Sequence, residues 1–261
     1  MSEGIAGPSI SAESLDRGFW TEERMLSARP MPLPPIPSPP AHTRSRSSRF
    51  MPRSPGLRHD ILGMPPPSPA PLDFEFFTDR VQTPAIYPYV SIGKLFFMMG
   101  NIAYVGSAAA CQMNGIIAAG HILYDPKTQT WASNIWFAPA YSPAGAPYGM
   151  WPVLQAFAQI QWIQQGKYDF DLGFARMGPG NPSNLPLGAR VGYLGLAINP
   201  VIDHQTAWDD VGYPYTPLPN YPFDGKTMWS CLSVFLRYND TQDSVVKADN
   251  FTQGASGSPW L

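Results

Sequence analysis

The fold class is decided by residues 94–99 (KLFFMM), 101–109 (NIAYVGSAA) and 114–124 (NGIIAAGHILY). Each is a short run of mostly apolar residues, and Gly, Asn or Asp residues, which favour turns, lie at or near its ends. Similar runs recur as far as residue 249. Many short strands with little helix indicate an all-β sandwich or barrel. The one helix that we expect lies over Pro152–Gln164, where apolar residues recur at intervals of three and four.

The composition divides the chain near residue 89. Seventeen of the 31 prolines precede residue 90, and residues 26–59 contain six arginines and no acidic residue. Proline fixes φ and lacks a backbone donor, so neither helix nor sheet extends through such a segment. The sequence therefore predicts a Pro/Arg-rich disordered region or propeptide over residues 1–89, with a short amphipathic piece near Glu13–Leu26. A folded domain is expected over residues 90–261.

Charge and composition argue against several classes of protein. Charged residues make up only 14% of the chain and the net charge is −2, so a nucleic-acid partner is not expected. The apolar stretch Leu95–Cys111 is short for a membrane span and is interpreted as buried strands, so no membrane association is expected. No HExxH or CxxC motif and no phosphate-binding Gly-rich loop is present, which predicts no metal site and no cofactor.

Three short motifs carry candidate chemistry. The octet GASGSPWL, residues 254–261, places Ser256 on a Gly-rich turn, GIIAAGHILYD ends a buried run at His121, and YDFDLGFARM contains Asp171. Each motif alone is more typical of an ordinary turn or strand end. Together they supply a nucleophile, a base and a carboxylate in the chain order His, Asp, Ser, separated by 50 and 85 residues. This combination indicates an acyl-transfer site.

The motifs resemble those of the trypsin-like serine peptidases, and the ending SGSP is similar to the V8-like, glutamyl-endopeptidase branch. The resemblance covers about residues 90–261 and implies two six-stranded antiparallel Greek-key β-barrels of trypsin-like type. It further implies a serine endopeptidase acting on polypeptides through an acyl-enzyme, with His121 as general base, Asp171 orienting it and Ser256 as nucleophile. The N–H groups of Gly254 and Ser256 would form the oxyanion hole. Asp169 is the competing carboxylate.

The end of the chain departs from this family. In the family two strands of the second barrel, a wall of the specificity pocket and a helix follow the nucleophile, whereas here five residues follow Ser256. The resemblance therefore predicts a second barrel that is incomplete at the C-terminus, and little or no activity if Leu261 is the true end. The alternative function is an inactive or fragmentary peptidase-like interaction module. Its Pro-rich tail carries an Arg29-anchored PxxP motif that would bind an SH3-type partner, against a plain disordered spacer as the other interpretation.

Cysteine usage and the N-terminus bear on the compartment. The family resemblance implies secretion, but the first thirty residues contain no apolar stretch typical of a signal peptide. Two free buried thiols are the favoured interpretation of Cys111 and Cys231, and a bridge between them is the alternative. The localisation is left open by these observations.

Overall fold

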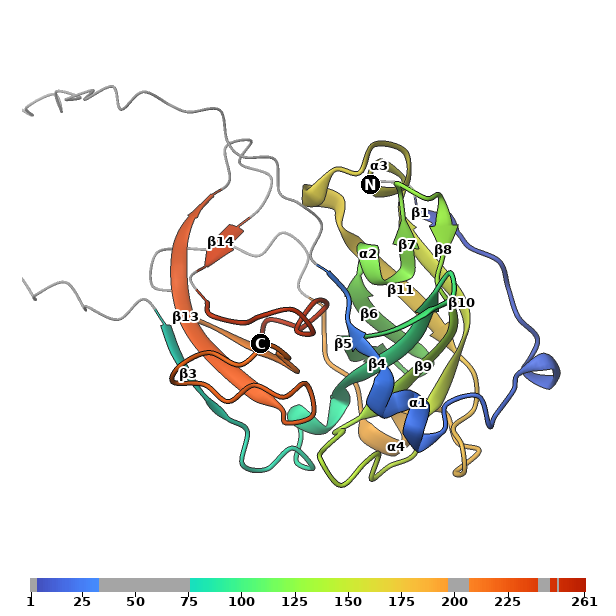
Figure 1. Cartoon of the computed structure of the whole chain (residues 1–261), viewed down its shortest axis with the longest axis horizontal. Coiled ribbons are helices and arrows are strands. Elements are labelled where there is room, and N and C mark those ends of the chain that lie inside the picture. Colours follow the sequence, from blue (N-terminus) through green and yellow to red (C-terminus); the bar gives the residue numbers. More distant parts are fainter. Residues whose placement is uncertain (1–3, 33–75, 197–206, 239–244, 248) are drawn as a thin grey trace, which may run out of the picture. The chain divides into compact units, whose positions relative to one another are not determined.

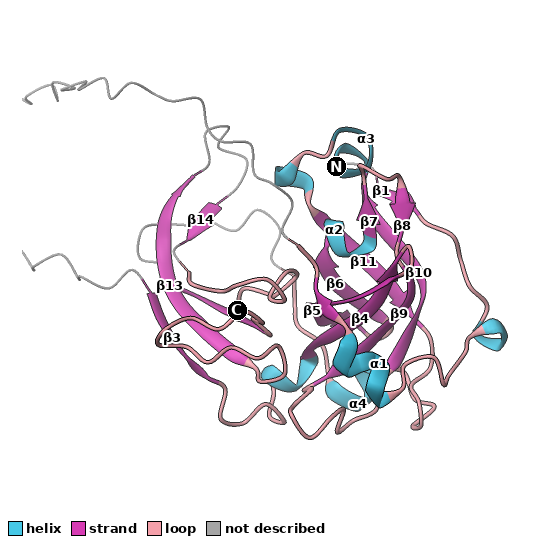
Figure 2. Cartoon of the chain, in the orientation of Figure 1, coloured by secondary structure: helices cyan, strands magenta, loops and turns pink. Residues whose placement is uncertain are grey.

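The computed structural model describes residues 4–32, 76–196, 207–238, 245–247 and 249–261 (Figure 1). Most of its regular structure is β-strand, and its helices are short (Figure 2). The all-β fold class expected from the sequence is confirmed by this architecture. No helix in the described part of the chain is long and apolar enough to cross a membrane.

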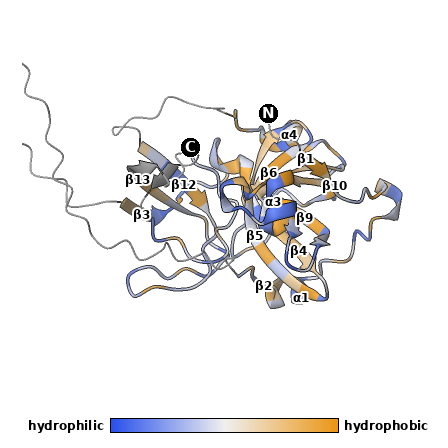
Figure 3. Ribbon diagram, turned by 90° about the horizontal axis from the view of Figure 1, so that it is seen from above, coloured by the Kyte–Doolittle hydropathy of each residue, from blue (hydrophilic) through white to orange (hydrophobic). Residues whose placement is uncertain are grey.

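A closed antiparallel barrel forms the first half of the domain. Its strands are hydrogen-bonded in the order β10-β11-β6-β5-β4-β9, and β9 pairs back onto β10, which closes six strands into a ring. The strands are β4 (Ile92–Met99), β5 (Ile102–Gln112), β6 (Gly115–Ala119), β9 (Ser133–Pro139), β10 (Trp151–Gln159) and β11 (Leu172–Met177). Figure 3 shows hydrophobic segments along β6 and β10.

Both faces of β4 and β5 are largely buried, which explains why their sequences are mostly apolar rather than alternating, with Lys94 and Ser107 as buried polar exceptions. Leu95 and Phe97 point into the core that fills the barrel. Phe96 and Val105 lie on the opposite face, in a second core to which the second half of the domain contributes Val211. A strand covered on two sides needs apolar side chains at successive positions.

The second half is a four-stranded antiparallel sheet in the described part of the chain. Strand β13 (Trp229–Tyr238) pairs with β12 (Ala207–Gly212), β14 (Val245–Lys247) and β3 (Phe76–Arg80). Among the described residues this sheet does not close into a barrel.

The helix expected over Pro152–Gln164 was wrong for most of its length. Residues 151–159 form strand β10, and only Ile160–Gln165 form a short helix, α3. The register of β10 against β11 shifts between Val153 and Gln155, the signature of a β-bulge. Buried positions therefore step from Val153 to Ala156, a spacing of three that imitates a helical period.

The N-terminal region is only partly as expected. The Pro/Arg-rich stretch 33–75 lies outside the described residues, whereas residues 4–32 carry β1 (Gly4–Ala6), α1 (Glu22–Ser27) and β2 (Arg29–Pro30). We call residues 4–32 the N-terminal arm. Strand β1 pairs with β10, β2 pairs in parallel with β5, and Trp20 is buried with its indole N–H donating to Asn134 O at 2.8 Å. The arm therefore packs on the barrel, because it brings apolar surface of its own.

The remaining elements are short connections between these strands. They are β7 (Tyr124–Asp125), β8 (Thr130–Trp131), α2 (Gly120–Leu123), α4 (Leu187–Val191) and the 3₁₀ turns Ala12–Ser14, Tyr89–Ser91 and Tyr168–Phe170. Helix α2 follows β6 and carries His121. The turn Tyr168–Phe170 comes before β11, and Asp171 lies directly after this turn.

Candidate active site

His121 and Asp171 meet at the ends of two neighbouring barrel strands. Strands β6 and β11 are antiparallel partners with Ala119 opposite Leu172. His121 follows the end of β6 in α2, and Asp171 immediately precedes β11. Two residues that are 50 positions apart in the sequence are thereby placed side by side by one register.

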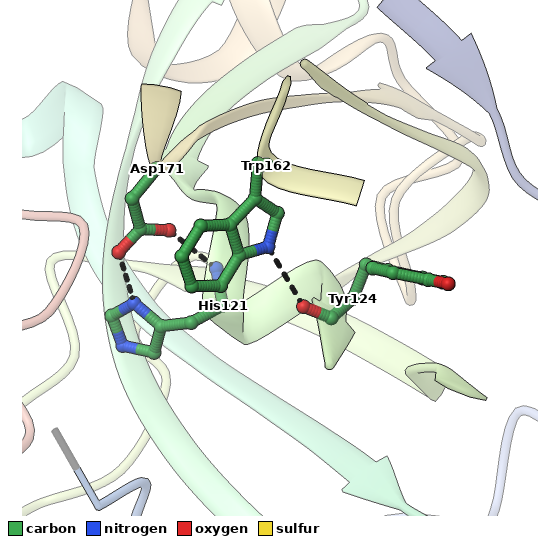
Figure 4. A network of polar contacts seen from close by, with 4 residues as sticks. All are labelled: His121, Tyr124, Trp162 and Asp171. Atoms are coloured by element: carbon green, nitrogen blue, oxygen red, sulfur yellow. Dashed lines mark hydrogen bonds and ion pairs between the residues drawn. The ribbon is translucent and has the colours of Figure 1, made fainter. Parts of the chain in front are cut away.

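Asp171 holds His121 through both of its carboxylate oxygens (Figure 4). The backbone N–H of His121 donates to Oδ1 at 2.6 Å, and Nδ1 of the ring lies 2.7 Å from Oδ2. A carboxylate only accepts hydrogen bonds, so this contact favours the tautomer with the proton on Nδ1. Nε2 then keeps its lone pair and is able to accept a proton. The carboxylate in contact with His121 is that of Asp171, whereas Asp169 is exposed in the turn before it.

Gly120 and Trp162 pack against this pair, and the sequence motifs did not indicate either role. A Cβ added at Gly120 would lie 2.9 Å from Asp171 Oδ1 and 3.0 Å from Trp162 Cδ1, so only glycine fits here. Trp162 is 2% exposed, and its indole N–H donates to Tyr124 O at 3.0 Å (Figure 4). The indole is therefore fixed beside Gly120.

The Ser256 loop lies against the same end of β6. A Cβ added at Gly257 would be 2.9 Å from Ala119 N and 3.3 Å from Ala118 Cα, so the peptide after Ser256 packs directly on the strand that leads to His121. The Oγ of Ser256 and Nε2 of His121 are both buried, and neither has a hydrogen-bond partner among the described residues. A hydroxyl and an imidazole nitrogen without partners are left on neighbouring segments.

The peptides around Ser256 have fixed orientations. Gln253 O accepts from Tyr215 N–H at 2.8 Å, and Ala255 O accepts from Ser258 N–H at 2.8 Å and from the Ser258 hydroxyl. In a trans peptide the C=O and N–H groups point in opposite directions. The N–H groups of Gly254 and Ser256 are therefore turned away from these partners, and the structure gives neither of them an acceptor among the residues it describes.

A buried lysine anchors the loop that carries Tyr215. Lys94 on β4 is 4% exposed, and its ammonium donates to Gly225 O at 2.6 Å beside the rings of Phe96 and Tyr141. Burial lowers the pKa of Lys94 from 10.5 to about 7, partly offset by the charge of Asp224. Gly225 N–H in turn donates to Pro214 O at 2.9 Å, next to Tyr215. This lysine therefore ties the barrel to the segment that contacts Gln253.

Cys111 and Cys231 are buried and are not joined by a disulfide, as favoured from the sequence. Burial raises the pKa of the Cys111 thiol to about 11, which keeps it protonated and unreactive near neutral pH. No group of three or more His, Cys, Asp or Glu side chains in the described ranges is arranged to hold a metal ion.

The Arg29-anchored PxxP motif is only partly within the described residues. Arg29 and Pro30 form β2, which pairs with β5, and the Arg29 guanidinium lies over the Tyr104 ring at 5.9 Å. The prolines from Pro34 onward lie outside the described residues. The part of the motif that is described is thus hydrogen-bonded to the barrel rather than presented as a free ligand.

Comparison with solved structures identifies the family. The protease Anisep from Arthrobacter nicotinovorans matches with 31% sequence identity and a TM-score of 0.58, over 66% of this chain and 76% of that one. The chain belongs to the trypsin-like serine peptidases. The thermostable serine protease AL20 from an extremophilic microorganism matches this peptidase with 26% identity and a TM-score of 0.59, over 66% and 78% of the two chains.

A Glu endopeptidase shares the fold of this trypsin-like peptidase at 20% identity, with a TM-score of 0.54 over 70% and 79% of the two chains. No family model matches the sequence, and no curated protein matches it either. The relationship to other serine peptidases is therefore seen through structure.

Proposed function

We propose that this chain is a serine endopeptidase that hydrolyses peptide bonds through an acyl-enzyme, with His121, Asp171 and Ser256 as its triad. The observation that carries the proposal is the His121–Asp171 pair. The second ring nitrogen of His121, Nε2, is buried and has no hydrogen-bond partner among the described residues, and it lies beside the Ser256 loop. A ring held in this way, on a segment beside the loop of a serine hydroxyl that also has no partner, supports a base–nucleophile pair whose two atoms come within hydrogen-bond reach when substrate binds.

The proposed reaction begins when Ser256 Oγ attacks the carbonyl carbon of the scissile peptide bond. His121 Nε2 accepts the hydroxyl proton, and Asp171 stabilises the resulting imidazolium through the 2.7 Å contact at Nδ1. The developing oxyanion accepts hydrogen bonds from the N–H groups of Gly254 and Ser256. His121 then donates its proton to the leaving amine. Water attacks the acyl-enzyme by the same route, which releases the second product and restores the Ser256 hydroxyl.

Support for the two oxyanion donors comes from the orientation of their peptides. The carbonyl of each peptide is already bonded on the protein side, to Tyr215 or to Ser258, so its N–H projects the other way. Donors fixed before substrate arrives need no reorganisation during the reaction, and such donors make a large contribution to transition-state stabilisation. The substrate is a polypeptide, as the protease relatives indicate.

Labelling with a fluorophosphonate probe tests the proposal. The wild-type chain should react covalently with the probe, and Ser256→Ala should abolish the reaction. Ser91→Ala removes another buried hydroxyl, which donates to Val191 O at 2.8 Å, and serves as the matched control that should still label. A folded wild-type sample without labelling, or equal labelling of Ser256→Ala, would refute the proposed nucleophile.

A further inference from the structure

Ser107 is a fully buried hydroxyl on the barrel face that contacts the second half of the domain. It lies on β5 directly opposite Lys94 on β4, so both side chains project from the same face of the barrel. The flanking residues on that face, Val105 and Ala109, belong to an apolar core. A serine at such a position loses its hydration, and its hydroxyl must find partners within the protein.

The partners that the structure describes for its hydroxyl and its N–H belong to two segments of the second half. The Ser107 hydroxyl donates to Gly254 O at 2.9 Å and accepts from Tyr213 N–H at 3.0 Å. Its backbone N–H donates to Ser256 O at 2.8 Å. One residue of the barrel therefore fixes the carbonyls of both residues whose N–H groups we assign to the oxyanion.

The contact with Tyr213 adds an indirect route to the same donors. Two residues later, Tyr215 N–H bonds Gln253 O, and that bond sets the direction of the Gly254 N–H. The fit is close, because a Cβ added at Gly254 would lie 2.7 Å from Tyr213 O and one added at Gly257 would lie 2.3 Å from Ser107 O. Small shifts of Ser107 are therefore transmitted to the loop rather than absorbed by empty space.

We propose that Ser107 is the positioning residue of the oxyanion-binding loop: its hydroxyl joins Gly254 to Tyr213, and its N–H holds Ser256, so that the two donor N–H groups are aimed before substrate binds. This inference rests on the proposed function of Ser256. Without the hydroxyl, Gly254 O and Tyr213 N–H are both buried and unpartnered, and the loop relaxes to satisfy them. A displacement of about 1 Å at a catalytic group costs on the order of 100-fold in rate.

The test compares Ser107→Ala with Ser91→Ala in the full chain. Both substitutions remove a fully buried hydroxyl that donates to a carbonyl, at 2.9 Å and 2.8 Å, and Ser107→Ala should lower the urea midpoint somewhat more because it also unpairs Tyr213 N–H. The second-order rate of fluorophosphonate labelling should fall about 10- to 100-fold in Ser107→Ala and stay within about 3-fold of wild type in Ser91→Ala. With a peptide substrate the loss should appear in kcat rather than in KM, which a purely structural role would not produce.

Ser107→Cys carries the test if Ser107→Ala does not fold. Its thiol nearly preserves the side-chain volume but is a weak hydrogen-bond donor, so labelling should still slow by about 10-fold or more. Labelling of either folded variant at the Ser91→Ala rate would refute the positioning role while leaving Ser256 as nucleophile. Failure of the folded wild type to label would refute the proposed function, and this inference with it.

Discussion

Asp171→Asn tests the His121–Asp171 contact, because it replaces one carboxylate oxygen by an NH₂ group and leaves the size of the side chain nearly unchanged. The two oxygens of Asp171 each accept one hydrogen bond from His121, one from the backbone N–H and one from Nδ1. An asparagine side chain offers one acceptor and one donor. The backbone N–H cannot change its role, so the amide oxygen should face it, and the amide NH₂ should face Nδ1.

The ring can satisfy that new donor only by shifting its proton to Nε2. His121 would then present an N–H toward Ser256 in place of a lone pair and would lose its function as a base. In the active tautomer the Nδ1–H of the ring would face the amide NH₂, so two donors would meet without an acceptor. The charge-assisted bond to Nδ1, worth about 1.5–3 kcal/mol, is lost as well. Together with the lost stabilisation of the imidazolium, we expect kcat/KM to fall by about 10³–10⁴, or about 4–5.5 kcal/mol.

The assay is the labelling rate with a fluorophosphonate, followed by hydrolysis of a peptide ester. Asp169→Asn is the matched control, because that carboxylate is exposed and lies two residues earlier in the same connection. It should react within about 3-fold of wild type and keep the free energy of unfolding to within about 0.5 kcal/mol, whereas Asp171→Asn should stay folded with a lower urea midpoint because it loses the charge-assisted bond. Activity of Asp171→Asn within tenfold of wild type, or an equal loss in Asp169→Asn, would contradict the tautomer argument.

Two further predictions concern stability. The unfolded chain keeps the Lys94 proton up to pH 10.5 and the folded chain only up to about 7, so the unfolded state binds more protons in between and the free energy of unfolding should rise with pH. Lys94 should contribute about 1.4 kcal/mol per pH unit to this rise between pH 7 and 9. Urea titrations at several pH values measure the slope of the free energy of unfolding against pH, which should be smaller in Lys94→Met. Equal slopes in the two proteins would show that the ammonium is not buried in solution. Trp20→Ala should lower the free energy of unfolding by about 3 kcal/mol, whereas Leu26→Ala, at a 53% exposed position of the same arm, should change it by less than about 0.5; equal effects would mean that the arm is not packed on the barrel.

The strand pattern was predictable because local propensity and tertiary structure agree along most of the barrel. The runs at residues 94–99, 101–109 and 114–124 fall within or overlap β4, β5 and β6. Prediction failed at β10, where the bulge after Val153 displaces the buried positions. A bulge depends on the pairing with another strand, so the local sequence does not predict it.

The N-terminal arm shows a different limit. Composition averaged over residues 1–89 is dominated by proline and arginine, which concealed the isolated Trp20 and the two-residue pairing of β2. A single buried indole anchors a short segment without any periodic pattern around it. Window-based reasoning therefore detects the Pro-rich stretch and misses the arm that precedes it.

For the proposed site, the sequence indicated the candidate triad and missed the residues that contact and position it. His121, Asp171 and Ser256 stand in motifs, and the structure brings His121 and Asp171 into contact. Gly120, Trp162, Lys94 and Ser107 act through contacts with distant segments, such as the 147-residue separation between Ser107 and Gly254. Nothing in their immediate sequence distinguishes them from ordinary core residues.

The attachment of the N-terminal arm has a consequence for any proteolytic maturation. The arm is held by backbone pairing with β5 and β10 and by the Trp20 indole, and Met31 N–H still donates to Val105 O at 3.2 Å. The next described element of the chain is β3, on the other sheet. A cut between residues 33 and 75 would thus produce a nicked, two-chain protein rather than a shortened one. Release of the first fragment would then be a dissociation event, with its own lifetime and concentration dependence.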